Sequence, residues 1–157
     1  MKRALFLLLA IFFAMQGWSQ TTLNEGFEGT LFPPDDWIAN HVSGSVSWGR
    51  YTSEGPRGTA CASVNWASAS HENWLITPRL QPQVGQNLTF YVKCPSYYDN
   101  TTLHVKISTT DVALSSFTTT ALTLIDEDIT TSWTQKTINL SAFSGQIIYV
   151  AFQVVDA

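Results

Sequence analysis

Carboxylates are the side chains in this sequence whose types and spacing could build a metal site. Glu25 and Glu28 bracket a Gly-Phe pair near the start, and residues 126–128 (D-E-D) form the densest acidic run. Hard cations such as Ca²⁺ prefer several oxygens from carboxylates and backbone carbonyls. Glu25, Glu28 and an aspartate from late in the chain could therefore hold calcium if the fold brings them together. The 126–128 run is more typical of a solvated turn between strands.

Covalent catalysis has no recognisable basis in this sequence. A hydrolase needs a nucleophile, a base and an oxyanion hole, but the chain contains no G-x-S-x-G elbow. His71 precedes Glu72, yet the second histidine of an H-E-x-x-H zinc motif does not follow. A single histidine on a strand, such as His104, is more often a surface residue than a base. We therefore predict that the chain is not an enzyme.

Tryptophans are the other side chains suited to binding. Exposed aromatic rings can stack on sugar rings, whereas most tryptophans of a β-sandwich fill its core. Trp74 and Trp133 lie in strand-like patterns, and we expect them in the core. Trp48 and Trp66 border Gly- and Ser-rich loops, which makes them the candidate ligand-binding residues, although burial is the commoner outcome for each.

Two cysteines, Cys61 and Cys94, each lie in a strand-like stretch. An exported protein meets an oxidising environment in which disulfides form. Because sequence alone does not give the separation of two cysteines, a disulfide between them and two separate thiols both stay open.

Short strands separated by Gly, Pro and Asn turns would position these side chains. Alternation with a period of two residues is clearest at 103–109 and 147–155, and charged residues are only 13% of the chain. This pattern predicts an all-β jelly-roll sandwich. The predicted strands are 23–29, 48–52, 59–66, 74–76, 88–94, 103–109, 121–125, 133–140 and 147–155, with a Pro-rich corner at 32–37, loops elsewhere within 41–58, a polar connection at 67–72, and a loop or single helical turn at 141–145.

The first 19 residues have the composition of a signal peptide. Lys2 and Arg3 precede an apolar run that is too short to cross a bilayer, and the small residues Gly17 and Ser19 follow it. Cleavage after Ser19 would leave one domain, residues 20–157, that starts at Gln20 and contains no transmembrane segment. It would carry 6 basic and 12 acidic residues, since two of the eight basic residues are removed. This balance excludes a nucleic-acid partner.

The chain stops at V-V-D-A, directly after a predicted strand. Natural sandwiches normally cover an unpaired edge. We therefore expect that the final strand leaves such an edge and that the domain is C-terminally truncated, lacking its last strand.

Several motifs occur in an order that carries a family signal. They are E-G-F-E-G followed by F-P-P-x-x-W, then C-A-S, E-N-W-L-I-T-P, L-T-F-Y-V-K, V-K-I-S-T-T, W-T-Q-K-T-I-N-L and S-G-Q-I-I-Y-V-A-F-Q. Together they resemble the cleaved-adhesin, or choice-of-anchor J, family of secreted Bacteroidetes modules, and N-W-L-I-T-P (73–78) is the most specific of them. The family includes the adhesin domains of gingipains, which look like MAM-type or galactose-binding-like jelly rolls.

The resemblance implies a non-catalytic module, secreted or on the outer cell surface, that adheres to a host extracellular protein or a glycan. It also implies structural calcium, with Glu28 as the best-matching ligand and Glu25, Asn73 and Asp156 as further ligands. The acidic D-x-D-G-D-G loop of many members is replaced here by A-N-H-V-S-G-S-V-S-W. The alternative is an accessory binding domain of a larger secreted peptidase or glycoside hydrolase.

Overall fold

Nine strands and three short 3₁₀ turns make up the described part of this computed structural model, which covers residues 23–65, 67–94 and 101–156. The predicted signal peptide lies outside these residues. The strands are β1 (Ile38–Ser43), β2 (Trp48–Tyr51), β3 (Cys61–Val64), β4 (His71–Ile76), β5 (Asn87–Val92), β6 (Thr101–Ser108), β7 (Thr119–Leu124), β8 (Thr134–Asn139) and β9 (Tyr149–Asp156), and the turns are η1 (Leu114–Ser116), η2 (Asp126–Asp128) and η3 (Ser141–Phe143).

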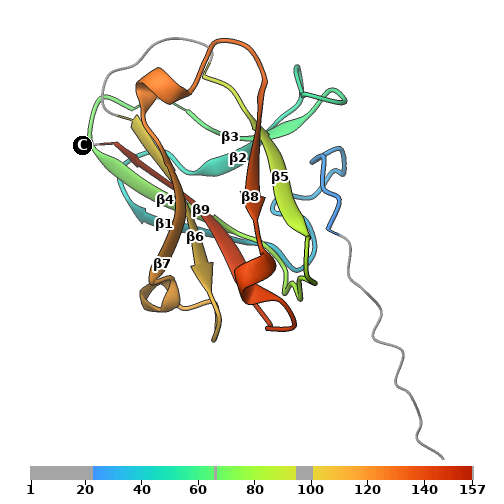
Figure 1. Ribbon diagram of the computed structural model, residues 1–157. Helices are drawn as coiled ribbons and strands as arrows, with labels where there is room; N and C mark the ends of the chain where they lie inside the picture. Colours follow the sequence, from blue (N-terminus) through green and yellow to red (C-terminus); the bar gives the residue numbers. More distant parts are fainter. Residues whose placement is uncertain (1–22, 66, 95–100, 157) are drawn as a thin grey trace, which may run out of the picture.

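The strands form a β-sandwich, as the alternating pattern predicts. One layer is a five-stranded antiparallel sheet in the order β1-β4-β9-β6-β7. Facing it are two antiparallel pairs, β2-β3 and β5-β8 (Figure 1). Strands that are distant in sequence are thus neighbours, as in a jelly roll. The all-β jelly-roll prediction is confirmed.

The core lies between these layers and follows from the two-residue period of the strands. Val105 and Ile107 of β6 and Val150 of β9 are each at most 2% exposed. Phe152 of β9 meets Phe90 of β5 across the sandwich, with ring centroids 5.1 Å apart. Each fully buried side chain of this size stabilises the fold by about 1.5–3 kcal/mol relative to exposure.

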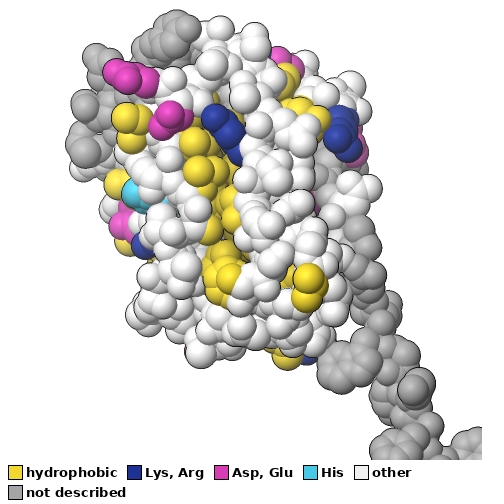
Figure 2. Space-filling model, in the orientation of Figure 1, with side chains coloured by type: hydrophobic (Ala, Val, Ile, Leu, Met, Phe, Trp, Pro, Cys, Tyr) yellow, Lys and Arg dark blue, Asp and Glu magenta, His cyan; other side chains and the backbone are white. Residues whose placement is uncertain are grey.

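The sandwich is not closed along the side between β7 and β8. Figure 2 shows a stripe of hydrophobic side chains running down this side of the molecule, between the strands that Figure 1 labels β7 and β8. No described strand pairing joins these two strands, so the edge of the core reaches the surface there. No helix in the described part of the chain is long and apolar enough to cross a membrane.

Three sequence-based expectations about the strands are wrong. Residues 23–29 do not form a strand, and the first strand is instead β1, in a stretch where Gly and Ser indicated loops. Its pairing with the buried β4 outweighs this weak local preference. His71 and Glu72, which the sequence predicts to lie in a polar connection, are instead the first two residues of β4. Finally, β9 is not an edge, since it pairs with β4 on one side and β6 on the other.

Candidate functional site

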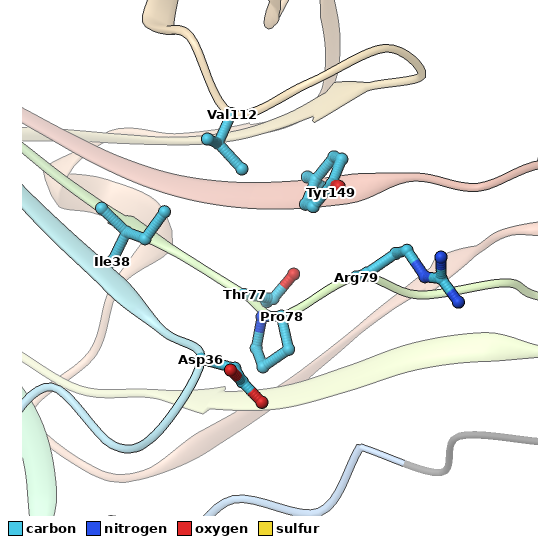
Figure 3. A pocket seen from close by; sticks show the side chains of 7 residues that line it. All are labelled: Asp36, Ile38, Thr77, Pro78, Arg79, Val112 and Tyr149. Carbon is cyan, nitrogen blue, oxygen red and sulfur yellow. The ribbon is translucent and has the colours of Figure 1, made fainter.

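A pocket of about 450 Å³ opens at the end of the five-stranded sheet where β1 and β9 begin and β4 ends (Figure 3). Ile38 of β1, Val112 of the loop after β6 and Tyr149 of β9 form its mostly apolar walls. The segment after β4 supplies Pro78 at the centre of the view, and Asp36 and Arg79 bring charge to the rim. The volume lies within the range of small-molecule sites in proteins, about 300–1,000 Å³.

Thr77 fixes the backbone beneath this pocket. It is 1% exposed, and its N–H donates to the carbonyl of Val150 at 2.9 Å. Its hydroxyl oxygen in turn accepts the N–H of Val150 at 3.1 Å. The buried hydroxyl therefore takes part in the sheet, and no basic side chain among residues 23–65, 67–94 and 101–156 hydrogen-bonds to it. The described lining of the pocket thus contains no activated nucleophile.

Residues 25–37, which we call the N-terminal strap, carry Asp36 to the pocket rim. Arg50 of β2 holds the strap, since its Nε donates to the carbonyl of Phe27 at 2.6 Å and its guanidinium to that of Glu28 at 2.9 Å. The Phe27 ring lies 5.5 Å from the Trp37 ring, centre to centre and edge-on. The E-G-F-E-G and F-P-P-x-x-W motifs are thus two halves of one packed unit.

Glu28 ties the strap to the β2–β3 hairpin. One carboxylate oxygen accepts the N–H groups of Thr59 and Ala60, each at 3.0 Å, and the other accepts the Thr59 hydroxyl at 3.2 Å. These donors, the Ala60 N–H foremost, lower the pKa of Glu28 below its usual value. A Cβ on Gly58 would lie 2.1 Å from the same carboxylate, so glycine is required for this close approach.

Asp36 occupies a turn position that aspartate tolerates at a cost. The Trp37 N–H donates to the Pro34 carbonyl at 3.0 Å, which closes a turn with Asp36 as its third residue. The φ of Asp36 is 66°, in the left-handed region that favours glycine or asparagine. Strained residues of this kind cluster at functional sites. The turn places the Asp36 carboxylate beside the Pro78 ring at the pocket (Figure 3).

Within the described part of the chain, the charged groups at the rim have no partner of opposite charge. The side chains of Asp36 and Arg79 are exposed, and neither makes a hydrogen bond or ion pair with any described residue. The Tyr149 hydroxyl is likewise without a partner among the described residues. In Figure 3 the Arg79 guanidinium extends away from Asp36. The rim therefore presents an acceptor, a donor fork and a phenol around an apolar interior.

Next to the pocket, the outer face of the five-stranded sheet is covered. Trp74 lies opposite Gln153, on the face that points away from the second layer. Its ring contacts Phe117 at 5.7 Å and Lys106 Nζ at 5.2 Å, measured to the ring centre. Only 4% of Trp74 is exposed, so the expected burial is confirmed. Glu72 accepts hydrogen bonds of 2.7 Å from both the Trp74 indole and the Gln153 amide.

The four predicted calcium ligands do not come together as a site. Asn73 is fully buried, its amide oxygen accepting from His41 at 2.9 Å and its amide nitrogen donating to His71 at 3.2 Å. Asp156 lies near the same histidine, with Oδ2 at 3.9 Å from Nε2 of His71.

Glu25 accepts the N–H of Phe27 and belongs to the strap, as does Glu28. Among the described residues no three His, Cys, Asp or Glu side chains are grouped for a metal. Side-chain oxygens of Glu25, Glu28 and Asn73 already accept protein hydrogen bonds, at two separate places. Calcium binding by these residues and Asp156 stays a prediction.

The tryptophan and cysteine candidates are placed as follows. Trp48 is partly buried, and it packs against the cluster of Leu103, Leu124, Ile129 and Val154 rather than standing free. Its stacking role stays a prediction, and Trp66 lies outside the described residues. Cys61 is the first residue of β3 and Cys94 follows β5, and the structure contains no disulfide between them. Burial raises the pKa of the Cys61 thiol.

Sequence reasoning missed the polar residues at the rim of the pocket, which are Asp36, Arg79 and Tyr149. Two signals could have pointed to them. Asp36 follows a Pro-Pro pair in a turn that has no glycine, and Arg79 directly follows the most specific motif, N-W-L-I-T-P. Their convergence depends on β1 and β9 both pairing with β4, which no local pattern reveals.

Comparison with known proteins places the whole predicted mature chain in one family. The model of the Cleaved Adhesin Domain matches residues 20–157, which confirms the resemblance carried by the sequence motifs. The comparison with curated proteins gave no match.

Solved structures show the same fold. The K1 cleaved adhesin domain of Lys-gingipain from Porphyromonas gingivalis is 24% identical, with a TM-score of 0.62 over 87% of this chain and 95% of that one. The K2 domain of Lys-gingipain is 15% identical, with a TM-score of 0.63 over 84% and 93%. TmCBM61, solved in complex with β-1,4-galactotriose, is 15% identical, with a TM-score of 0.57 over 83% of both chains. At these identities the likeness shows the fold alone.

Proposed function

The chain belongs to the Cleaved Adhesin Domain family, and we propose that it is a non-catalytic recognition module that binds a glycan or a host extracellular protein. The observation that carries this proposal is the family match, which runs through the entire predicted mature chain. The pocket supports it, because its rim offers polar groups without a partner in the described chain and its buried hydroxyl, that of Thr77, takes part in the sheet.

A glycan is the ligand class that the fold favours between the two. TmCBM61 shares the jelly roll and was solved with β-1,4-galactotriose. Sandwich modules commonly carry their binding residues on loops at the ends of strands, and the pocket here lies where three strands leave their sheet. A host protein remains the second ligand class, and it is separated from glycans by experiment.

The proposed site of action is outside the cell, in secreted form or on the outer surface. The predicted signal peptide supports this location, and the family match begins at residue 20, immediately after the predicted cleavage site. N-terminal sequencing of the protein from culture medium and cell envelope should give a chain that starts at Gln20. A chain retaining Met1 in both fractions would contradict export by this signal.

A role within a larger secreted enzyme is the second candidate. It is favoured by one observation, that the K1 and K2 cleaved adhesin domains, which share this fold, are parts of Lys-gingipain. Reading the gene beyond codon 157 separates the two roles. A peptidase or glycoside hydrolase domain in frame would support the accessory role, and further copies of this module without one would support adhesion.

Binding arrays test the recognition function directly. The purified protein should bind a subset of glycans, or of extracellular matrix proteins, in a saturable manner, and it should hydrolyse none of the glycans that it binds. Silence on both arrays would overturn the proposed recognition function, and turnover of a bound glycan would overturn its non-catalytic character.

A further inference from the structure

We propose that the pocket between Asp36, Arg79 and Tyr149 binds one neutral sugar unit at the exposed end of a glycan. The inference rests on the proposed recognition function and adds the place and the class of ligand. Three features of the pocket support it: the charges left unpaired at its rim, the apolar surface inside it, and the backbone conformation at which one rim residue is held.

The unpaired charges at the rim favour a ligand with hydroxyl groups. A carboxylate only accepts hydrogen bonds and a guanidinium only donates them. Each sugar hydroxyl does both, so a ring can donate to Asp36 and accept from Arg79 without carrying a charge. Hydrogen bonds to charged groups are also stronger than those between neutral groups.

Charged ligands fit the same rim less well. An acidic sugar attracted to Arg79 would meet the Asp36 carboxylate, and an amine attracted to Asp36 would meet the guanidinium. A free amino acid also fits less well, because its ammonium and carboxylate groups lie close together. The charged atoms of Asp36 and Arg79 are more than 4.0 Å apart, since the two side chains form no ion pair. In Figure 3 the Arg79 side chain extends away from Asp36. Hydroxyls that radiate from a ring suit this divergent arrangement.

The interior of the pocket suits the apolar C–H face of a sugar. Ile38, Val112 and the Pro78 ring present aliphatic surface (Figure 3). Tyr149 adds an aromatic ring whose hydroxyl has no hydrogen-bond partner among the residues that the structure describes. Aromatic side chains with a polar tip serve sites that are apolar at one end and wet at the other. A volume of about 450 Å³ is near the small end of the usual range, which favours one terminal unit over a long chain.

The backbone of Asp36 indicates that its carboxylate is retained for binding. At φ 66° a glycine would fit the turn without steric cost, and the Asp36 side chain makes no hydrogen bond or ion pair with a described residue. Asp36→Gly should therefore leave the melting temperature unchanged or raise it. Because it removes a charged acceptor, it should also weaken sugar binding about tenfold or more.

The test measures calorimetric binding of neutral methyl glycosides (galactose, glucose, mannose, N-acetylglucosamine and fucose) to the whole protein. Asp36→Gly and Arg79→Gln should each lower the affinity about tenfold or more, and Tyr149→Phe should lower it less, because it removes only a neutral hydroxyl. Asp35→Asn is the matched control, since it changes the same charge one residue away, outside the pocket lining, and it should bind as the wild type does.

The outcomes separate the pocket from the recognition function. If the wild-type protein binds array glycans and the Asp36 and Arg79 variants bind them equally well, the pocket assignment is overturned while recognition stands. If the protein binds N-acetylneuraminic acid or free leucine but none of the neutral glycosides, and Asp36→Gly loses this binding, the proposed class of ligand is overturned. If the protein binds matrix proteins and no sugar, the sugar site is overturned and the module is a protein binder. Silence on all arrays overturns the recognition function itself.

Discussion

Replacing Asn73 by alanine should destabilise the protein strongly and independently of calcium. Asn73 is 0% exposed, and its side-chain amide makes hydrogen bonds with two histidines. Its Oδ1 lies 2.9 Å from Nδ1 of His41, and its Nδ2 lies 3.2 Å from Nδ1 of His71. Because an amide nitrogen can only donate, Nδ1 of His71 is the acceptor, and the substitution leaves this atom without its partner in a residue that is 3% exposed. An orphaned buried polar group costs about 1–3 kcal/mol, and each lost hydrogen bond about 0.5–1.5 kcal/mol.

The expected loss for Asn73→Ala is therefore about 2–4 kcal/mol in the free energy of unfolding. Urea unfolding followed by tryptophan fluorescence measures it, and the melting temperature should fall by roughly 4 °C for each kcal/mol. Asn87→Ala is the matched control: Asn87 begins β5 and is exposed, and its loss should stay within about 0.5 kcal/mol.

The unfolding series should be run in calcium and in EDTA. We expect the same loss in both, and no shift of the wild-type melting temperature, because the Asn73 amide is already bound to two histidines. If Asn73→Ala lowers the free energy of unfolding no more than Asn87→Ala does, the two hydrogen bonds of Asn73 to the histidines do not stabilise the fold as stated. A loss seen only in calcium would show that Asn73 is a metal ligand, as the family resemblance implied.

Three further predictions concern the strap and the thiols. Hydrogen bonds lower the folded-state pKa of Glu28 below 4.5, so the contribution of this carboxylate to stability is present above that pH and is lost as the pH falls through the folded pKa. The stability of Glu28→Gln should therefore fall less steeply with acid than that of the wild type. An unchanged pH profile would contradict the role of Glu28 in holding the β2–β3 hairpin. Gly58→Ala should lower the melting temperature, because the new Cβ would lie 2.1 Å from the Glu28 carboxylate, and the loss should be smaller when Glu28 is also replaced by alanine. Gly49→Ala is the control, since nothing lies within 4 Å of its Cβ. If the losses of Gly58→Ala and Glu28→Ala simply add in the double variant, the two residues are not in contact. Thiol titration of unfolded, unreduced protein should find two thiols per chain, Cys61 reacting slowly in the folded state because its pKa is raised; zero thiols would reveal a disulfide.

The fold could be predicted from the sequence wherever alternation was strong. Val105 and Ile107 are buried as the pattern in β6 predicts, and the strands from β5 onward lie within a few residues of their expected bounds. Prediction failed at β1, where I-A-N-H-V-S has no alternation. This strand exists because it pairs with β4, itself held between neighbours on both sides. The paired residues, such as Ile38 and Ile76, are distant in sequence, so this pairing is a tertiary effect that local preference does not contain.

The sequence motifs predicted a residue that holds the strap in place and did not predict the residues at the rim of the pocket. Glu28 stood out for its motif, and the structure gives it a role in binding the β2–β3 hairpin. The carboxylate at the pocket is instead that of Asp36, whose importance depends on a positive φ and on the approach of Tyr149 from the last strand. A sequence states neither the backbone angle nor that approach, so motif reasoning identified the support and missed the pocket.

The sugar site is tested most directly by an NMR titration of the ¹⁵N-labelled protein with the five neutral methyl glycosides. At least one of them should shift the backbone amide signals of Asp36, Arg79 and Tyr149 in a saturable manner. Asp36→Gly should keep the spectrum of a folded protein and need about tenfold or more glycoside for the same shifts. Shifts confined to another surface, such as that around Trp48, or no shift with any of the five sugars, would contradict a sugar site in this pocket.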